Sequence, residues 1–136
     1  MKPKNPNEKN LKALTEKDFD KAVQLILNKI KEIYGLVPLV LEVLSRRPDI
    51  FIPFSQMFDN LFLKPRYLSQ KSVELISLGA ATALGSESCI VVHFMQARKA
   101  GASIDEIFGA ILIETIMTMA KSQAIAFRKF HELKDK

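Results

Sequence analysis

Cys89 and His93 carry the clearest chemical potential in the sequence, because they place a thiol and an imidazole four positions apart. Side chains four apart on a helix share a face, so the imidazole could take a proton from the thiol or return one. Ser86 is a suitable helix N-cap three residues before Cys89. With that cap, Cys89 is the third helical residue, where the backbone amides and the helix dipole favour a thiolate.

Glu74 adds a carboxylate from the preceding segment. Gly85 is the expected pivot of an antiparallel helical hairpin, eleven residues after Glu74 and eight before His93. At 1.5 Å per residue, Glu74 and His93 then lie roughly 16 and 12 Å from the turn. Glu74 is therefore about one helical turn from the level of His93, where it could orient the imidazole or relay its proton.

The same three side chains also have a purely structural interpretation. A lone cysteine on a helix is commonly a small buried apolar group. A lone histidine on an apolar helix is commonly a satisfied core or interface residue, and Glu74 alone is compatible with a helix-surface charge. Spacing by itself leaves both interpretations open.

Helices are expected to position these groups, because apolar residues recur at three- and four-residue steps and no stretch alternates convincingly as a strand. The sequence therefore predicts an all-α fold with a central antiparallel helical hairpin. The expected helices are one between Thr15 and Gly35, a short one over 39–45, one capped by Asp49 that begins late or bends at Pro53, the hairpin pair over 70–84 and 87–100, and a last one with a capping box of Ser103 and Glu106.

Length and composition favour one ordinary globular domain. The chain has 136 residues, of which 48% are apolar and 26% are charged, a balance that supports a buried core. We expect a polar N-terminal arm over 1–14 and a single helical domain over 15–136. One cysteine excludes a disulfide within the chain, and with two histidines a closed zinc site would need ligands from several subunits. No phosphate-binding loop is present, and no cofactor or metal is expected.

The protein is expected to be cytoplasmic and to associate with itself. The sequence begins without the apolar core of a secretory signal, and its longest apolar stretch, 107–120, is shorter than a membrane span. That stretch is apolar nearly all round, so it must be buried on every side, which predicts contacts between subunits. The net charge of +5 lies largely at the chain ends, without a nucleic-acid-binding motif. We expect a homo-oligomer, with no nucleic-acid and no membrane partner.

The segment 72–107 resembles the signature of the carboxymuconolactone decarboxylase and alkylhydroperoxidase D family. That signature has a helix with a glutamate, then a helix with Cys-x-x-Cys-x-x-x-His, an Ala-x-x-x-Gly-Ala end and a capped helix containing Glu-Ile. Glu74 matches the relay glutamate, Cys89 the second cysteine and His93 the histidine. The structural end is matched by Ala97, Gly101, Ala102, Glu106 and Ile107.

The resemblance implies an all-α fold that assembles as trimers or hexamers of helical hairpins. In the redox branch, the second cysteine reacts with peroxide, the first resolves it as a disulfide, and the glutamate and histidine relay protons. The decarboxylase branch acts on a lactone of aromatic degradation and does not use the cysteine pair.

Ser86 stands where the family has its first cysteine, so a self-contained dithiol cycle is excluded. The leading hypothesis is a thiol-dependent, peroxidase-like oxidoreductase in which Cys89 forms a sulfenic acid that an external thiol reduces. His93 and Glu74 would handle protons, with Ser86 in a supporting position. A carboxy-lyase acting on a carboxylated lactone and a non-catalytic oligomeric binding protein are the alternatives.

Overall fold

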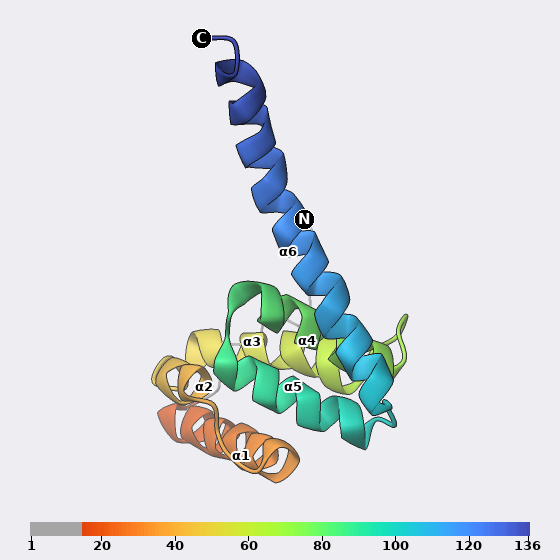
Figure 1. The fold of residues 1–136 in the computed structure, drawn as a ribbon. Helices are drawn as coiled ribbons and strands as arrows, with labels where there is room; N and C mark the ends of the chain where they lie inside the picture. Colours follow the sequence, from red (N-terminus) through yellow and green to blue (C-terminus); the bar gives the residue numbers. More distant parts are fainter. Residues whose placement is uncertain (1–14) are drawn as a thin grey trace, which may run out of the picture. The chain divides into compact units, whose positions relative to one another are not determined.

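The computed structural model describes residues 15–136, and the predicted polar arm over 1–14 lies outside the described residues. Every regular element in the described part is a helix (Figure 1), which confirms the predicted all-α fold. Backbone contacts divide the described chain into two compact units, one ending at Asp59 and the other beginning at Asn60. The single domain predicted over 15–136 stays a prediction.

The described part of the first unit consists of three helices, α1 (Glu16–Tyr34), α2 (Leu39–Leu44) and α3 (Pro48–Phe58). Thr15 begins α1 with a capping box, since its backbone N–H donates to Asp18 Oδ2 at 2.9 Å. Gly35 ends α1 in the left-handed region with φ of 80°, as predicted. The core of this unit is formed by Val23, Ile30, Leu41 and Phe51.

The start of α3 differs from the expectation. Arg47 occupies the N-cap position and Pro48 is the first helical residue, where its missing N–H leaves no bond unmade. Asp49 therefore lies inside the first turn, and the guanidinium of Arg47 donates to both of its carboxylate oxygens at 2.9 and 2.7 Å. Pro53 stands within the helix, so the helix does not begin late, and the alternative of a bend at Pro53 stays a prediction.

The second unit begins within a π-helical turn, η2 (Asp59–Leu63), and contains α4 (Gln70–Leu84), α5 (Glu87–Lys99) and α6 (Ile104–Leu133). The bounds of α4 and α5 agree with the predicted hairpin to within one residue. Gly85, at φ of 63°, ends α4 and turns the chain into α5, which lies beside it (Figure 1). The core is formed by Leu78, Ala97, Ala102 and Ile107.

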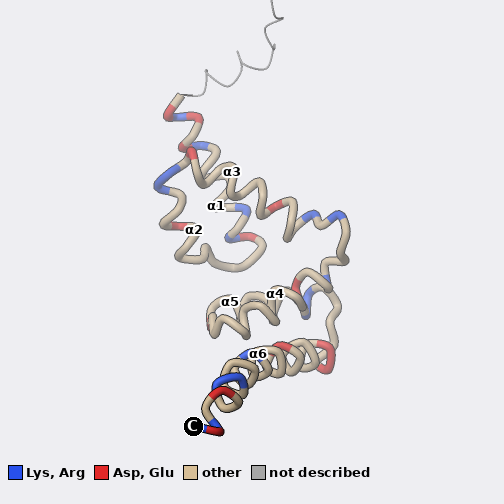
Figure 2. Tube along the Cα trace, turned by 90° about the horizontal axis from the view of Figure 1, so that it is seen from above, with Lys and Arg blue, Asp and Glu red and all other residues tan. Residues whose placement is uncertain are grey.

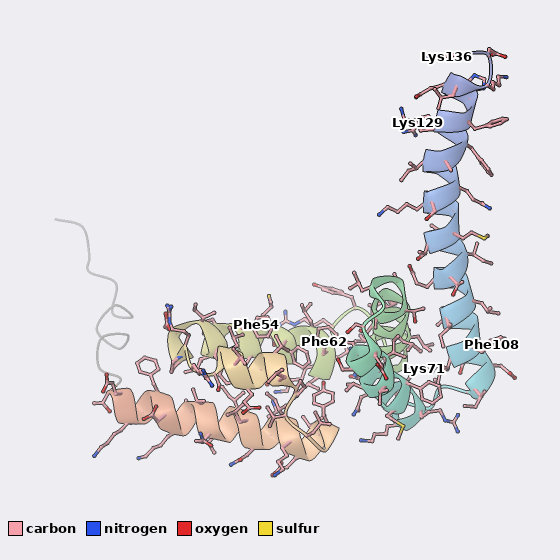
Figure 3. The ribbon with its side chains drawn as sticks, turned by 60° about the vertical axis from the view of Figure 1, so that its left-hand side comes forward. Phe54, Phe62, Lys71, Phe108, Lys129 and Lys136 are labelled. Carbon is pink, nitrogen blue, oxygen red and sulfur yellow. The ribbon has the colours of Figure 1, made fainter. Side chains whose placement is uncertain are left out.

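Helix α6 begins as predicted and then runs on as one continuous helix of 30 residues. The Ser103 hydroxyl accepts from Glu106 N–H at 3.0 Å, and the Glu106 carboxylate accepts from Ser103 N–H at 2.8 Å. Only the first part of α6 packs against α4, because every residue over 115–136 is exposed. Figure 3 shows these side chains projecting on all sides of the helix beyond Phe108, out to Lys129 and Lys136.

The exposed part of α6 is unusually apolar. Over 107–120 its one charged residue is Glu114, and most of this part of α6 is tan in Figure 2. In the described part of the chain, α6 is the one helix long and apolar enough to cross a membrane, by length and composition alone. The sequence analysis considered the apolar run of 107–120, whereas this criterion applies to the whole helix, so the absence of a membrane partner stays a prediction. Core helices of soluble proteins meet the same criterion but are mostly buried, whereas the apolar window of α6 is not buried within the described chain.

Candidate active site

The α4–α5 hairpin brings Glu74 and His93 into direct contact. Ser69 caps the start of α4 by accepting a hydrogen bond from Ser72 N–H at 3.1 Å. Leu78 of α4 and Ala97 of α5 are buried in the core between the helices. Across this interface, the Nδ1 of His93 lies 2.8 Å from Glu74 Oε2. Residue counts from Gly85 placed the two residues about one helical turn apart along the hairpin. In the structure they are close enough for a hydrogen bond.

Glu74 is a buried carboxylate, with 3% of its side chain exposed, and His93 is 16% exposed. A carboxylate in such a position is costly unless its oxygens are hydrogen-bonded. An ionised Glu74 can only accept, so the imidazole donates from Nδ1 and keeps Nε2 free to accept a proton. The pair therefore has the geometry of an oriented general base.

Gln70 completes the bonding of this carboxylate, and the sequence analysis missed it. Its amide Nε2 donates to Glu74 Oε1 at 2.8 Å and to the backbone oxygen of Phe62 at 2.7 Å. Both carboxylate oxygens of Glu74 thus have a donor. The available signal was the four-residue spacing of Gln70 and Glu74 on a predicted helix.

Phe62 is the second residue that the sequence analysis missed. Its ring stacks on the His93 imidazole, with ring centroids 6.1 Å apart and planes inclined by 29°. Phe62 comes from η2, where a π-helical turn replaces the end of a regular helix. No residue pattern predicted that turn, and π-helical turns are frequent at functional sites.

Cys89 lies at the surface of the described chain, near the start of α5. Ser86 occupies the N-cap position as expected, which makes Cys89 the third residue of the helix, although the Ser86 side chain makes no capping hydrogen bond. Cys89 precedes His93 by one helical turn on α5. The structure thus joins Glu74 and His93 by a hydrogen bond and leaves the thiol accessible one turn away.

No group of three or more His, Cys, Asp or Glu side chains that could hold a metal ion occurs over 15–136. The chemical groups of the candidate site are the Glu74 carboxyl, the His93 imidazole and the Cys89 thiol.

Comparison with known proteins places these residues in a family. The sequence model of the carboxymuconolactone decarboxylase family matches residues 48–128, more than half of the chain. This chain belongs to the carboxymuconolactone decarboxylase family. The matched region includes Glu74, Cys89 and His93, and the resemblance inferred from 72–107 is confirmed.

A solved structure supports the same fold. The chain resembles the crystal structure of a protein from Burkholderia xenovorans LB400, provisionally named a carboxymuconolactone decarboxylase. The two share 23% sequence identity with a TM-score of 0.64, over 73% of this chain and 77% of the other. No functionally curated protein is significantly similar to this member of the family. The carboxymuconolactone decarboxylase family includes both decarboxylases and peroxidases, so membership leaves the reaction open.

Proposed function

We propose that this protein is a thiol-dependent, peroxidase-like oxidoreductase with Cys89 as its one reactive thiol. The observation that carries the proposal is the buried Glu74–His93 pair on the same hairpin as an exposed cysteine one helical turn from the histidine. A thiol near the N-terminus of a helix, with an oriented imidazole on its own helix, is suited to nucleophilic attack.

In the proposed reaction, Nε2 of His93 takes the proton of the Cys89 thiol. The thiolate attacks one oxygen of an alkyl hydroperoxide, so an S–O bond forms, the O–O bond breaks and the cysteine becomes a sulfenic acid. The leaving alkoxide receives the proton from His93 and departs as an alcohol. The Glu74 carboxylate stabilises the imidazolium between these two transfers through its bond to Nδ1.

Two equivalents of an external thiol complete the cycle. The first attacks the sulfenic acid sulfur, releasing water and forming a mixed disulfide with Cys89. The second reduces that disulfide, which restores the Cys89 thiol and releases an oxidised disulfide. Ser86 cannot form a resolving disulfide, so the external thiol is required. A reducing cytoplasm is the proposed location, since it supplies such thiols.

We also propose that the working form is a homo-oligomer, a trimer or hexamer. Its support is the exposure of large apolar side chains along α6, including Ile113, Ile116 and Met117, which are each more than half exposed. Exposed large apolar side chains that gather on one helix mark an interaction surface, and a second copy of an apolar helix can cover them.

The test is reduction of an alkyl hydroperoxide with dithiothreitol as the thiol, comparing wild type with Cys89→Ser. The matched control is Ser88→Ala, a change at the neighbouring exposed position. We expect Cys89→Ser to abolish thiol-dependent turnover and Ser88→Ala to retain it. Unchanged turnover in Cys89→Ser would falsify the proposal.

A carboxy-lyase is the second candidate, and one observation favours it. The hydrogen bond between Glu74 and His93 does not involve Cys89, and Ser86 stands in place of the first cysteine of the family motif. Carbon dioxide release from a carboxylated lactone that persists in Cys89→Ser and falls in His93→Ala would support this activity. A chain inactive in both assays would fit the third hypothesis, a non-catalytic oligomer that binds a ligand.

A further inference from the structure

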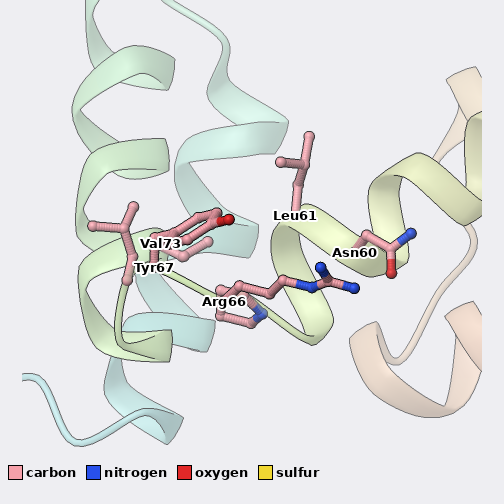
Figure 4. A pocket seen from close by; sticks show the side chains of 7 residues that line it. Asn60, Leu61, Arg66, Tyr67 and Val73 are labelled. Atoms are coloured by element: carbon pink, nitrogen blue, oxygen red, sulfur yellow. The ribbon is translucent and has the colours of Figure 1, made fainter.

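A concavity lies within the second unit, and its lining residues take no part in the proposed reaction. It has a volume of about 310 Å³ and is bounded by η2, the loop after it and the start of α4 (Figure 4). Its apolar walls include Leu61, Leu68 and Val73. This volume is at the lower end of the ~300–1,000 Å³ typical of small-molecule sites.

Arg66 places a positive charge on this apolar concavity. Its side chain makes no ion pair or hydrogen bond with any residue over 15–136. Figure 4 shows the guanidinium extending toward the side chain of Asn60, which also lines the concavity. A guanidinium offers a planar fork of donors that fits a carboxylate in a bidentate manner, and a neighbouring amide can donate as well.

The apolar walls offer surface that a ligand would remove from water. Leu61 is 57% exposed and Leu68 is 51% exposed, although both line the concavity. Tyr67 is 94% exposed, and in Figure 4 its ring lies beside Val73 with the hydroxyl directed toward the concavity. Covering such surface stabilises a complex by about 25 cal/mol per Å² before the costs of binding are subtracted.

The concavity is built on the same two segments as the Glu74–His93 pair. In η2, Leu61 lines the concavity while the next residue, Phe62, stacks on His93. In α4, Val73 lines it while the next residue, Glu74, bonds His93. In each segment, one residue thus lines the concavity and the next residue contacts His93. The π-helical turn therefore contributes to both sites.

We propose that this concavity binds a small monocarboxylate with an apolar chain or ring. The carboxylate would accept from the Arg66 guanidinium, and the apolar body would lie against Leu61, Leu68 and Val73. The site does not depend on the Cys89 chemistry, because none of these residues takes part in that reaction.

The probe is octanoate, titrated into the full chain without peroxide or thiol and followed by amide chemical shifts and calorimetry. We expect binding with shifts concentrated over 60–73 and Arg66→Gln weakening it at least about tenfold, the loss of one charge-assisted interaction. Lys64→Gln is the matched control, since Lys64 is an exposed cation of the same loop that does not line the concavity. We expect it to bind octanoate as the wild type does.

Octanol separates the roles of charge and apolar surface, and it should bind less tightly than octanoate. Equal binding of octanoate by Arg66→Gln and wild type, equal binding of octanol and octanoate, or no binding at all would overturn the proposal. A change of oligomer size in Arg66→Gln would also overturn it, because the loop would then be a subunit contact. Thermal melting checks that both variants fold. Peroxide turnover is not measured here, so failure of this site and failure of the Cys89 mechanism are distinguishable.

Discussion

The α4–α5 hairpin and the later part of α6 belong to the same unit but differ in what they bury and what they expose. The hairpin buries a carboxyl group and gives each of its oxygens a hydrogen-bond partner, because Gln70 and His93 each bond one oxygen of Glu74. Over 115–133, by contrast, α6 exposes apolar side chains that nothing in the described chain covers. The hairpin is complete within one chain, whereas α6 is not. The comparison supports both proposals, because the acid–base pair forms within one chain and α6 offers an apolar surface for assembly.

The largest expected effect is on catalysis in the hairpin. Replacing His93 by Ala removes the proposed general base and should lower peroxide turnover by about 10²–10⁴-fold. It also leaves the buried Glu74 carboxylate without one of its donors, which should lower the free energy of unfolding. Peroxide consumption and chemical denaturation measure the two effects.

His93→Gln separates these two roles, since an amide can still donate to Glu74 but cannot shuttle a proton. We expect it to lose turnover as His93→Ala does while retaining more of the stability. If His93→Gln kept full turnover, proton transfer by His93 would be excluded.

The hairpin core should be the next most sensitive region. Leu78 is fully buried, and its replacement by Ala should lower the free energy of unfolding by about 2–5 kcal/mol. The loss should be the same at low and high protein concentration, because Leu78 packs inside its own chain. Urea denaturation over a range of concentrations tests this, and a concentration-dependent loss would contradict the comparison.

The apolar face of α6 should respond differently. A lysine in place of Ile116, which is 57% exposed, should raise the dissociation constant of the oligomer by about tenfold or more, since a buried unpaired charge is costly at an interface. Light scattering against concentration measures it. Ser122→Lys, beside Lys121 in a polar part of the same helix, is the control and should assemble normally. Unchanged assembly in Ile116→Lys would remove the proposed role of this face.

Local signals account for the parts of the fold that could be predicted. Capping and turn residues act within a few positions, so Ser69, Gly85 and Ser103 marked the ends of α4 and the start of α6 correctly. Counting residues from Gly85 along the two helices placed Glu74 about one helical turn from the level of His93, and the hydrogen bond between them was found only in the structure. The family match followed from residue types at fixed spacing over the same hairpin.

Non-local packing accounts for what could not be predicted. The π-helical turn places Phe62 on His93, but its sequence reads as an ordinary helix end. The sequence analysis placed the start of α3 too late. Asp49 is a residue type that often caps helices, but Pro48 before it is better suited to the first helical position. Whether Cys89 is reactive depends on its surroundings in the assembled protein, which residue spacing does not specify.

The smallest expected effect is at the capping box that begins α6, where hairpin and α6 meet. The pKa of Glu106 is held below its ordinary value of 4.5, mainly by the hydrogen bond from Lys71 and then by the bond from the backbone N–H of Ser103. A carboxylate with a lowered pKa contributes stability that is present above pH 4.5 and is lost as pH falls through the folded-state value. Glu106→Gln keeps an acceptor for the cap but removes the charge, so it should be less stable than wild type at pH 7 by a small amount.

That difference in the free energy of unfolding should shrink steadily below pH 4.5, as the wild-type carboxylate becomes protonated. Asp105→Asn is the control, because it removes a charge from the same first turn without touching Lys71. Its effect should reflect only the helix dipole and should be reduced by salt. If the two variants showed the same pH dependence, the Lys71–Glu106 bond between α4 and α6 would add nothing beyond general charge at a helix start. The junction of the two regions would then depend on the apolar contact of Ile107 with the hairpin core.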